Sequence, residues 1–248
     1  MKKHALTLSC TMLWIAATIF VSTAGAVDSF GDPFEGNKLQ NPNWKWQNEP
    51  KKWDVGNTQK DFLHVEGEVN RNLWADDQSH FLFQETDTQE LEIETHFFAK
   101  WATDSGVNGV VIKSPADNNW VTIKFWSRAG GTGQIQYQTK QNENGNGLTG
   151  NAGFVPKNGE AELFLRLAKE GDDYTSWYKT TENEKWIDIG VTTFKLTPPL
   201  QLGIFTGVAA AAGTLAVDYE YFRDNLNPFA IDPSGKTTTM WGKIKSQF

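Results

Sequence analysis

Residues 120–126 read Trp-Val-Thr-Ile-Lys-Phe-Trp, and residues 134–138 read Gln-Ile-Gln-Tyr-Gln. In both runs apolar and polar side chains alternate with period two, the pattern of a β-strand with one buried face and one outward face. The intervening segment 130–133, Gly-Gly-Thr-Gly, indicates a tight turn. The stretch therefore predicts a β-hairpin whose core-facing side chains include Val121, Ile123 and Phe125.

The same alternation recurs along the chain, in residues 90–97, 109–113, 161–168, 174–180, 200–206 and 215–222. Turn-forming residues separate these runs, and no segment after residue 26 sustains the 3.6-residue period of an amphipathic helix. Many short antiparallel strands, each with one polar face, predict an all-β, two-sheet antiparallel β-sandwich. Residues 141–159, rich in Asn and Gly, are expected to form one long exposed loop.

The N-terminus predicts a cleaved secretory signal peptide over residues 1–26. A basic start is followed by an apolar run too short to cross a membrane, and then by small residues at 22–26. We therefore expect residues 27–228 to form the sandwich domain and residues 229–248 to form a flexible C-terminal tail. Export predicts a secreted, periplasmic or cell-surface location, without membrane insertion after cleavage.

The net charge and the cysteine content of the chain argue against some classes of function. The formal net charge is −7, and it becomes −9 when residues 1–26 are removed with their two lysines and no acid. An acidic chain does not favour nucleic-acid binding. The single cysteine, Cys10, lies in the predicted signal peptide, so neither an intrachain disulfide framework nor a cysteine zinc site is expected.

Several short motifs, taken in order, resemble the concanavalin A-like jelly rolls found at the C-terminus of β-xylosidases. They are residues 34–53 (with Trp44, Trp46 and Trp53), 72–74, 91–95, 105–112, 119–123, 165–167, 175–178, 184–186, 203–205 and 217–222. The same domain also occurs alone in uncharacterised bacterial proteins. The resemblance covers about residues 30–223. It implies a jelly-roll fold and an association with carbohydrates, and it supplies no catalytic residues.

The outward face of the predicted hairpin is the leading candidate site. By parity it carries Trp120, Lys124, Trp126 and Arg128 on one strand and Gln134, Gln136 and Gln138 on the next. Aromatic rings stack on the apolar face of a sugar, while amides and charges bond its hydroxyl groups. These seven residues predict binding of a poly- or oligosaccharide. The alternative is that the tryptophans only cover the sheet.

Two other clusters of carboxylates are candidates. Glu90 and Glu94 share one strand face, as the nucleophile and acid/base of a jelly-roll glucanase do, but a solvated strand face with alternating charge is the favoured explanation. Asp32 and Glu35 could meet Asp218 and Glu220 at a calcium site if the terminal strands pair, although no loop shows a contiguous ligand pattern. No other cofactor is predicted.

The leading hypothesis is an exported, non-catalytic carbohydrate-binding jelly roll. The alternatives are a glycoside hydrolase of glucanase type that uses Glu90 and Glu94, and a structural or adhesive surface protein attached through the tail around Trp241.

Overall fold

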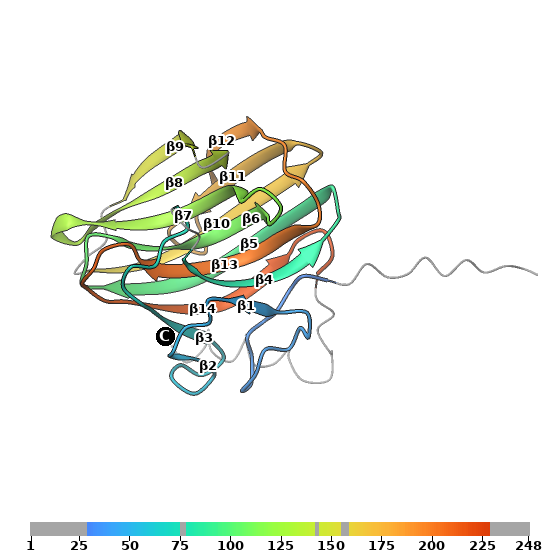
Figure 1. Ribbon diagram of the computed structural model, residues 1–248. Helices are drawn as coiled ribbons and strands as arrows, with labels where there is room; N and C mark the ends of the chain where they lie inside the picture. The colour runs from blue at the N-terminus through green and yellow to red at the C-terminus, as the bar shows by residue number, and fades with distance from the viewer. Residues whose placement is uncertain (1–28, 75–77, 142–143, 155–158, 229–248) are drawn as a thin grey trace, which may run out of the picture.

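The computed structural model describes residues 29–74, 78–141, 144–154 and 159–228, with the backbone alone for residues 129 and 144–151. The chain forms two antiparallel sheets that lie face to face as two layers (Figure 1). The predicted two-sheet β-sandwich is thus confirmed. The one helical turn among these residues is a 3-10 turn at Ala129–Gly131.

Each sheet has seven strands, and half of the neighbouring strand pairs are not consecutive in the chain. Sheet I has the order β1 (Lys45–Gln47), β4 (His80–Thr86), β13 (Leu200–Val208), β6 (Gly106–Ser114), β7 (Asn119–Arg128), β8 (Thr132–Gln141) and β9 (Asn144–Phe154). Sheet II has the order β12 (Ile187–Thr193), β11 (Asp173–Lys179), β10 (Glu160–Glu170), β5 (Glu90–Trp101), β14 (Leu215–Asp224), β3 (Leu63–Gly67) and β2 (Trp53–Val55).

The predicted hairpin is β7 and β8. Lys124 lies opposite Gln136 and Trp126 opposite Gln134 in its antiparallel ladder. Gly130 and Gly131 both have φ of +74°, a left-handed conformation that residues with a Cβ adopt at a cost, and this explains the glycine pair in the turn. The pairing predicted from the period-two pattern is therefore confirmed.

The long loop expected over residues 141–159 is wrong in part. Residues 144–154 form strand β9, which pairs with β8 and shows register irregularities around Gln138. A strand built largely of Asn and Gly carries little apolar alternation, so its pattern resembles that of a loop. The ladder of backbone hydrogen bonds to β8 is what holds it in the sheet.

The core lies between the sheets. Val121, Ile123 and Phe125 are fully buried there, facing residues from sheet II such as Leu165 and Phe97. Burial of a side chain of this size contributes roughly 1.5–3 kcal/mol. The hairpin is consequently fixed with its polar positions turned away from sheet II.

A second, smaller apolar cluster covers part of the outward side of sheet I. Its buried members are Leu73, Phe81, Phe83, Val107, Val111, Trp120 and Phe205, with Trp74 and Trp126 packed against it. Leu73 and Trp74 come from residues 68–79, which connect β3 to β4. This connection lies against the sheet, because Arg71 N–H donates to the Val208 carbonyl at 2.9 Å, and a Cβ on Gly207 would stand 2.5 Å from the Arg71 oxygen.

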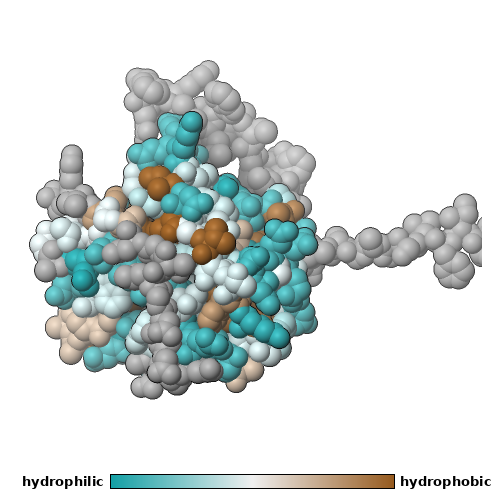
Figure 2. Space-filling model, turned by 90° about the horizontal axis from the view of Figure 1, so that it is seen from above, coloured by the Kyte–Doolittle hydropathy of each residue, from teal (hydrophilic) through white to brown (hydrophobic). Residues whose placement is uncertain are grey.

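The edge of the sandwich at β9 and β12 is more polar than the core between the sheets. Figure 2 views the molecule from the side of β9 and β12, where the surface is mostly hydrophilic with a few apolar residues near its middle. Ile187 and Val191 of β12 are 45% and 58% exposed. Among the described residues, no helix is long and apolar enough to cross a membrane.

The described chain enters and leaves the sandwich at adjacent points. Asp32 forms an antiparallel bridge with Phe222, with N–H to carbonyl distances of 2.7 and 2.9 Å. The predicted signal peptide and the predicted tail, including Trp241, lie outside the described residues. The division of the chain at residues 26 and 228 therefore stays a prediction.

Candidate functional site

A pocket of about 280 Å³ opens on the outward face of sheet I. Its walls are Asn72, Trp74, Trp126, Arg128, Gln136 and Gln138. Strands β7 and β8 supply four of these residues through the alternation that buries Val121, Ile123 and Phe125. The β3–β4 connection supplies Asn72 and Trp74, so the pocket lies between the sheet and the connection that crosses it.

Four of the seven predicted sugar-contacting residues meet in this pocket: Trp126, Arg128, Gln136 and Gln138. Gln134 lies beside them and accepts a hydrogen bond from Gln136 Nε2 at 3.1 Å. Lys124 is only 1% exposed and lies behind the wall, with its Nζ 4.8 Å from the centre of the Trp126 ring. The predicted patch is thus a pocket wall with a buried cation behind it.

Trp120 is placed differently from the prediction. Its parity is outward as expected, but its side chain is completely buried in the second apolar cluster, and its ring meets that of Trp74 edge-on at 5.7 Å. A ring covered in this way cannot stack on a sugar. The assignment of Trp120 as a ligand contact is therefore corrected, because the β3–β4 connection covers it.

Trp74 and Asn72 are the lining residues that reasoning from strand patterns missed. Their segment carries no period-two alternation, and parity assigns faces only within a strand. The one available signal was the short motif at residues 72–74 in the family resemblance, which did not indicate any contact with a ligand.

Two polar side-chain atoms at the pocket have no hydrogen-bond partner among the described residues. The side-chain oxygens of Gln136 and Gln138 are buried, and neither accepts a hydrogen bond from the described residues. A buried polar atom without a partner costs roughly 1–3 kcal/mol. The arrangement offers two indole rings and three amides within one small space.

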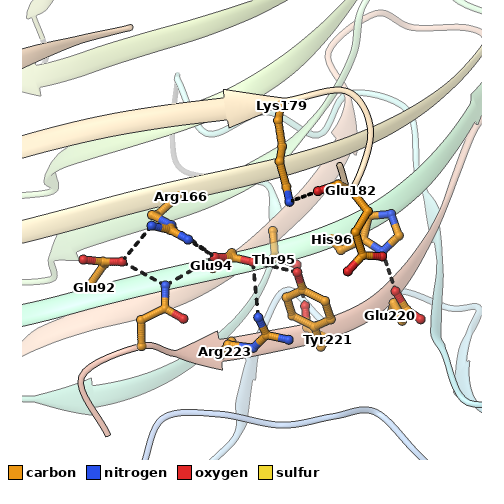
Figure 3. Close-up of polar contacts among 11 residues, drawn as sticks. Glu92, Glu94, Thr95, His96, Arg166, Lys179, Glu182, Glu220, Tyr221 and Arg223 are labelled. Carbon is orange, nitrogen blue, oxygen red and sulfur yellow. Dashed lines mark hydrogen bonds and ion pairs between the residues drawn. The ribbon is translucent and has the colours of Figure 1, made fainter. Parts of the chain in front are cut away.

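The carboxylates of the predicted glucanase alternative lie on the opposite side of the molecule, on the outward face of sheet II. Glu94 is 3% exposed and is surrounded by donors (Figure 3). Tyr221 Oη donates to it at 2.7 Å, Arg166 Nη2 at 2.6 Å and Asn225 Nδ2 at 3.3 Å, and Arg223 Nη1 lies 3.5 Å away.

These contacts decide what Glu94 can do. Burial alone would raise the pKa of Glu94, but the hydrogen bonds from Tyr221 and Arg166 outweigh it and leave the pKa lowered. A general acid of a glycosidase needs a raised pKa and access to substrate. Glu94 is the centre of a buried ion cluster that links β5, β10 and β14. Glu90 is exposed at the start of β5. This geometry gives the glucanase alternative no support.

The residues of the predicted calcium site do not come together. Asp32 accepts hydrogen bonds from the N–H groups of Phe34, Gln40, Asn41 and Trp44 at 2.8–3.0 Å. Burial raises the pKa of Asp32 although these bonds oppose it. Asp218 lies 2.7 Å from His64 Nδ1 and raises the pKa of that imidazole. Within the described residues, no group of three or more His, Cys, Asp or Glu side chains is placed to hold a metal ion.

Comparison with solved structures shows the same fold in proteins of low sequence identity. A xylan β-1,4-xylosidase from Bacillus halodurans C-125 is 16% identical with a TM-score of 0.64, over 78% of this chain and 38% of that enzyme. A functionally unknown protein from Saccharomyces cerevisiae is 14% identical with a TM-score of 0.56, over 76% of this chain and 98% of that protein. SCLam, a non-specific endo-β-1,3(4)-glucanase of family GH16, is 14% identical with a TM-score of 0.51, over 79% and 90%.

The present chain spans only about two fifths of the length of the xylosidase that it matches. No match is found among the curated proteins. A family model described as the β-xylosidase C-terminal concanavalin A-like domain matches residues 31–223, which include every strand except the last residue of β14. The predicted resemblance is confirmed: the chain belongs to the family of β-xylosidase C-terminal concanavalin A-like domains.

Proposed function

We propose that this protein is an exported, non-catalytic carbohydrate-binding jelly roll that holds a saccharide in the pocket between β7, β8 and the β3–β4 connection. The observation that carries the proposal is the lining itself, in which Trp74 and Trp126 stand with Asn72, Gln136 and Gln138. A sugar ring needs an apolar surface for its C–H face and amides for its hydroxyl groups. The carbohydrate-related family is consistent with such a ligand.

The non-catalytic part of the proposal rests on the same lining. Glycoside hydrolysis requires a pair of carboxyl groups on either side of the scissile bond. The described lining residues include no Asp or Glu. Glu94, a buried carboxylate of sheet II, accepts hydrogen bonds from neighbouring strands and lies on the other face.

A direct test is a glycan array that covers neutral and acidic saccharides, followed by calorimetry with the best ligand. Replacing Trp126 with Ala should weaken binding at least about tenfold, equivalent to about 1.4 kcal/mol, because a stacking surface is removed. Trp177→Ala is the matched control, since Trp177 lies on β11 in the other sheet, and it should leave binding unchanged. Absence of binding to any glycan, or equal binding by the Trp126→Ala variant, would overturn the proposal.

A further inference from the structure

The arginine at the pocket differs from the other arginines of the chain. The sequence has four arginines, all within the described residues, and three of them pair with carboxylates. These pairs are Arg71–Glu68 at 3.7 Å, Arg166–Glu94 at 2.6 Å and Arg223–Glu94 at 3.5 Å. Arg128 forms no ion pair or side-chain hydrogen bond with the described residues, and it lines the pocket. Its guanidinium group is therefore available to a ligand.

A second cation lies directly behind the pocket wall. The Lys124 side chain is buried between Gly109 of β6 and Gln136 of β8, and its Nζ lies 4.8 Å from the centre of the Trp126 ring. No carboxylate of the described residues is within ion-pair distance of it. Burial lowers the pKa of Lys124 to about 7, so a negative charge nearby would stabilise its protonated form.

The surrounding strands contain no negative charge. Strands β6, β7 and β8 carry Lys113, Lys124, Arg128 and Lys140 at outward positions and contain no Asp or Glu at all. The described charged groups of the covering β3–β4 connection, Glu68 and Arg71, pair with each other. This cationic face belongs to a chain in which 30 acidic residues outnumber 23 basic ones. Of the four basic residues on these strands, Lys124 and Arg128 lie at the pocket and have no carboxylate partner among the described residues, and positive groups so placed favour an anionic ligand.

We propose that the saccharide of this pocket is acidic and carries the carboxylate of a uronic acid, which Arg128 binds while Lys124 supplies a second positive charge behind Trp126. The inference rests on the proposed carbohydrate-binding function and adds the class of sugar to it. A planar carboxylate matches the fork of a guanidinium group, which binds it with two parallel hydrogen bonds. The indole rings and amides then hold the rest of the sugar ring.

The test uses calorimetry on the full chain with two ligands of equal length, a xylo-oligosaccharide with a glucuronic acid branch and the same oligosaccharide without it. Oligogalacturonate serves as an acidic ligand with a different backbone. We expect an acidic ligand to bind at least about tenfold more tightly than the neutral one. Arg128→Gln should remove most of this preference, whereas Lys100→Gln, an exposed lysine of β5, should not change it.

Lys124 gives the test a second readout. Affinity for the acidic ligand should fall as the pH rises through about 7, where Lys124 loses its proton. The Lys124→Met variant should lose that pH dependence and still bind neutral sugar. A preference for acidic sugars that survives Arg128→Gln, or equal binding of acidic and neutral ligands, would overturn this inference. If acidic and neutral ligands bind equally and Trp126→Ala weakens both, the acidic preference is overturned but the carbohydrate-binding function is not. If no ligand binds, both proposals are overturned.

Discussion

At the scale of single residues, Lys124 is a buried charge behind the pocket wall that folding must accommodate. A buried ammonium group without a carboxylate partner favours the neutral amine, and this is why its pKa falls from 10.5 to about 7. In the unfolded chain the same lysine keeps its ordinary pKa. Between about pH 7 and pH 10.5 the unfolded state therefore binds more protons than the folded state, and the free energy of unfolding rises with pH.

This difference predicts that the Lys124→Met variant is more stable than the wild-type protein at pH 6, by an amount on the order of a few kcal/mol. The gain should shrink as the pH rises from 7 toward 10.5, because removing the proton from Lys124 on folding then costs progressively less free energy. Urea denaturation at several pH values measures it. Lys100→Gln is the control and should behave as the wild type. A Lys124→Met variant that is less stable at pH 6 would show that Lys124 is compensated in the free protein.

Strand parity predicted part of the site at this scale. It placed Trp126, Arg128, Gln136 and Gln138 on one outward face, and all four line the pocket. It could not separate Trp126 from Trp120, because both residues have the same parity and differ only in what covers them. The cover is Leu73 and Trp74, and no alternation within a strand shows where a connection between strands will lie.

At the scale of the elements, sheet II is held by charge as well as by apolar packing. Glu94 of β5 contacts Arg166 of β10 and both Tyr221 and Arg223 of β14. Because the hydrogen bonds lower the pKa of Glu94 in the folded state, its contribution to stability is present above its unfolded pKa and is lost as the pH falls through the folded value.

Replacing Glu94 with Gln should destabilise the protein by about 3 kcal/mol, since Arg166 and Arg223 lose a charged partner. Chemical denaturation at pH 7 measures the loss. Glu90→Gln, an exposed position on the same strand face, should change stability by less than about 0.5 kcal/mol. Sugar binding should be the same in both variants, because the cluster lies on the opposite sheet. Loss of binding in a folded Glu94→Gln variant would contradict this separation.

Strand β9 shows where prediction at this scale fails. Strands with an apolar face, such as residues 90–97 and 200–206, are recognisable because their side chains anchor them to the core. Residues 144–154 pair with β8 through backbone groups that every residue has, so their side chains carry little signal. The order of strands within each sheet was likewise not predictable, because pairs such as β5 with β14 join segments more than a hundred residues apart.

At the scale of the whole molecule, charge is distributed unevenly. The chain is acidic overall, yet the three neighbouring strands β6, β7 and β8 carry only basic charges. From these strand charges we expect a field near the pocket opposite in sign to the net charge of the protein. Such a field attracts an anion locally and is screened by salt.

Raising the salt concentration from about 10 mM to about 1 M shortens the screening length from about 30 Å to about 3 Å. Affinity for an acidic oligosaccharide should then fall severalfold, while affinity for a neutral sugar should change little, because stacking and hydroxyl hydrogen bonds do not depend on long-range fields. Calorimetry at the two salt concentrations checks this. An equal loss for both ligands would contradict a role for the cationic face.

The bridge between Asp32 and Phe222 determines how the sandwich can be joined to other domains. The chain enters and leaves the fold at neighbouring points, so all the strands lie between two attachment points that are close in space. A unit with this topology can be appended to a neighbouring domain, or inserted into a surface loop of one, without threading either chain through the other. The pocket would be kept in such a fusion, because the strands and the connection that form it all lie between the two attachment points.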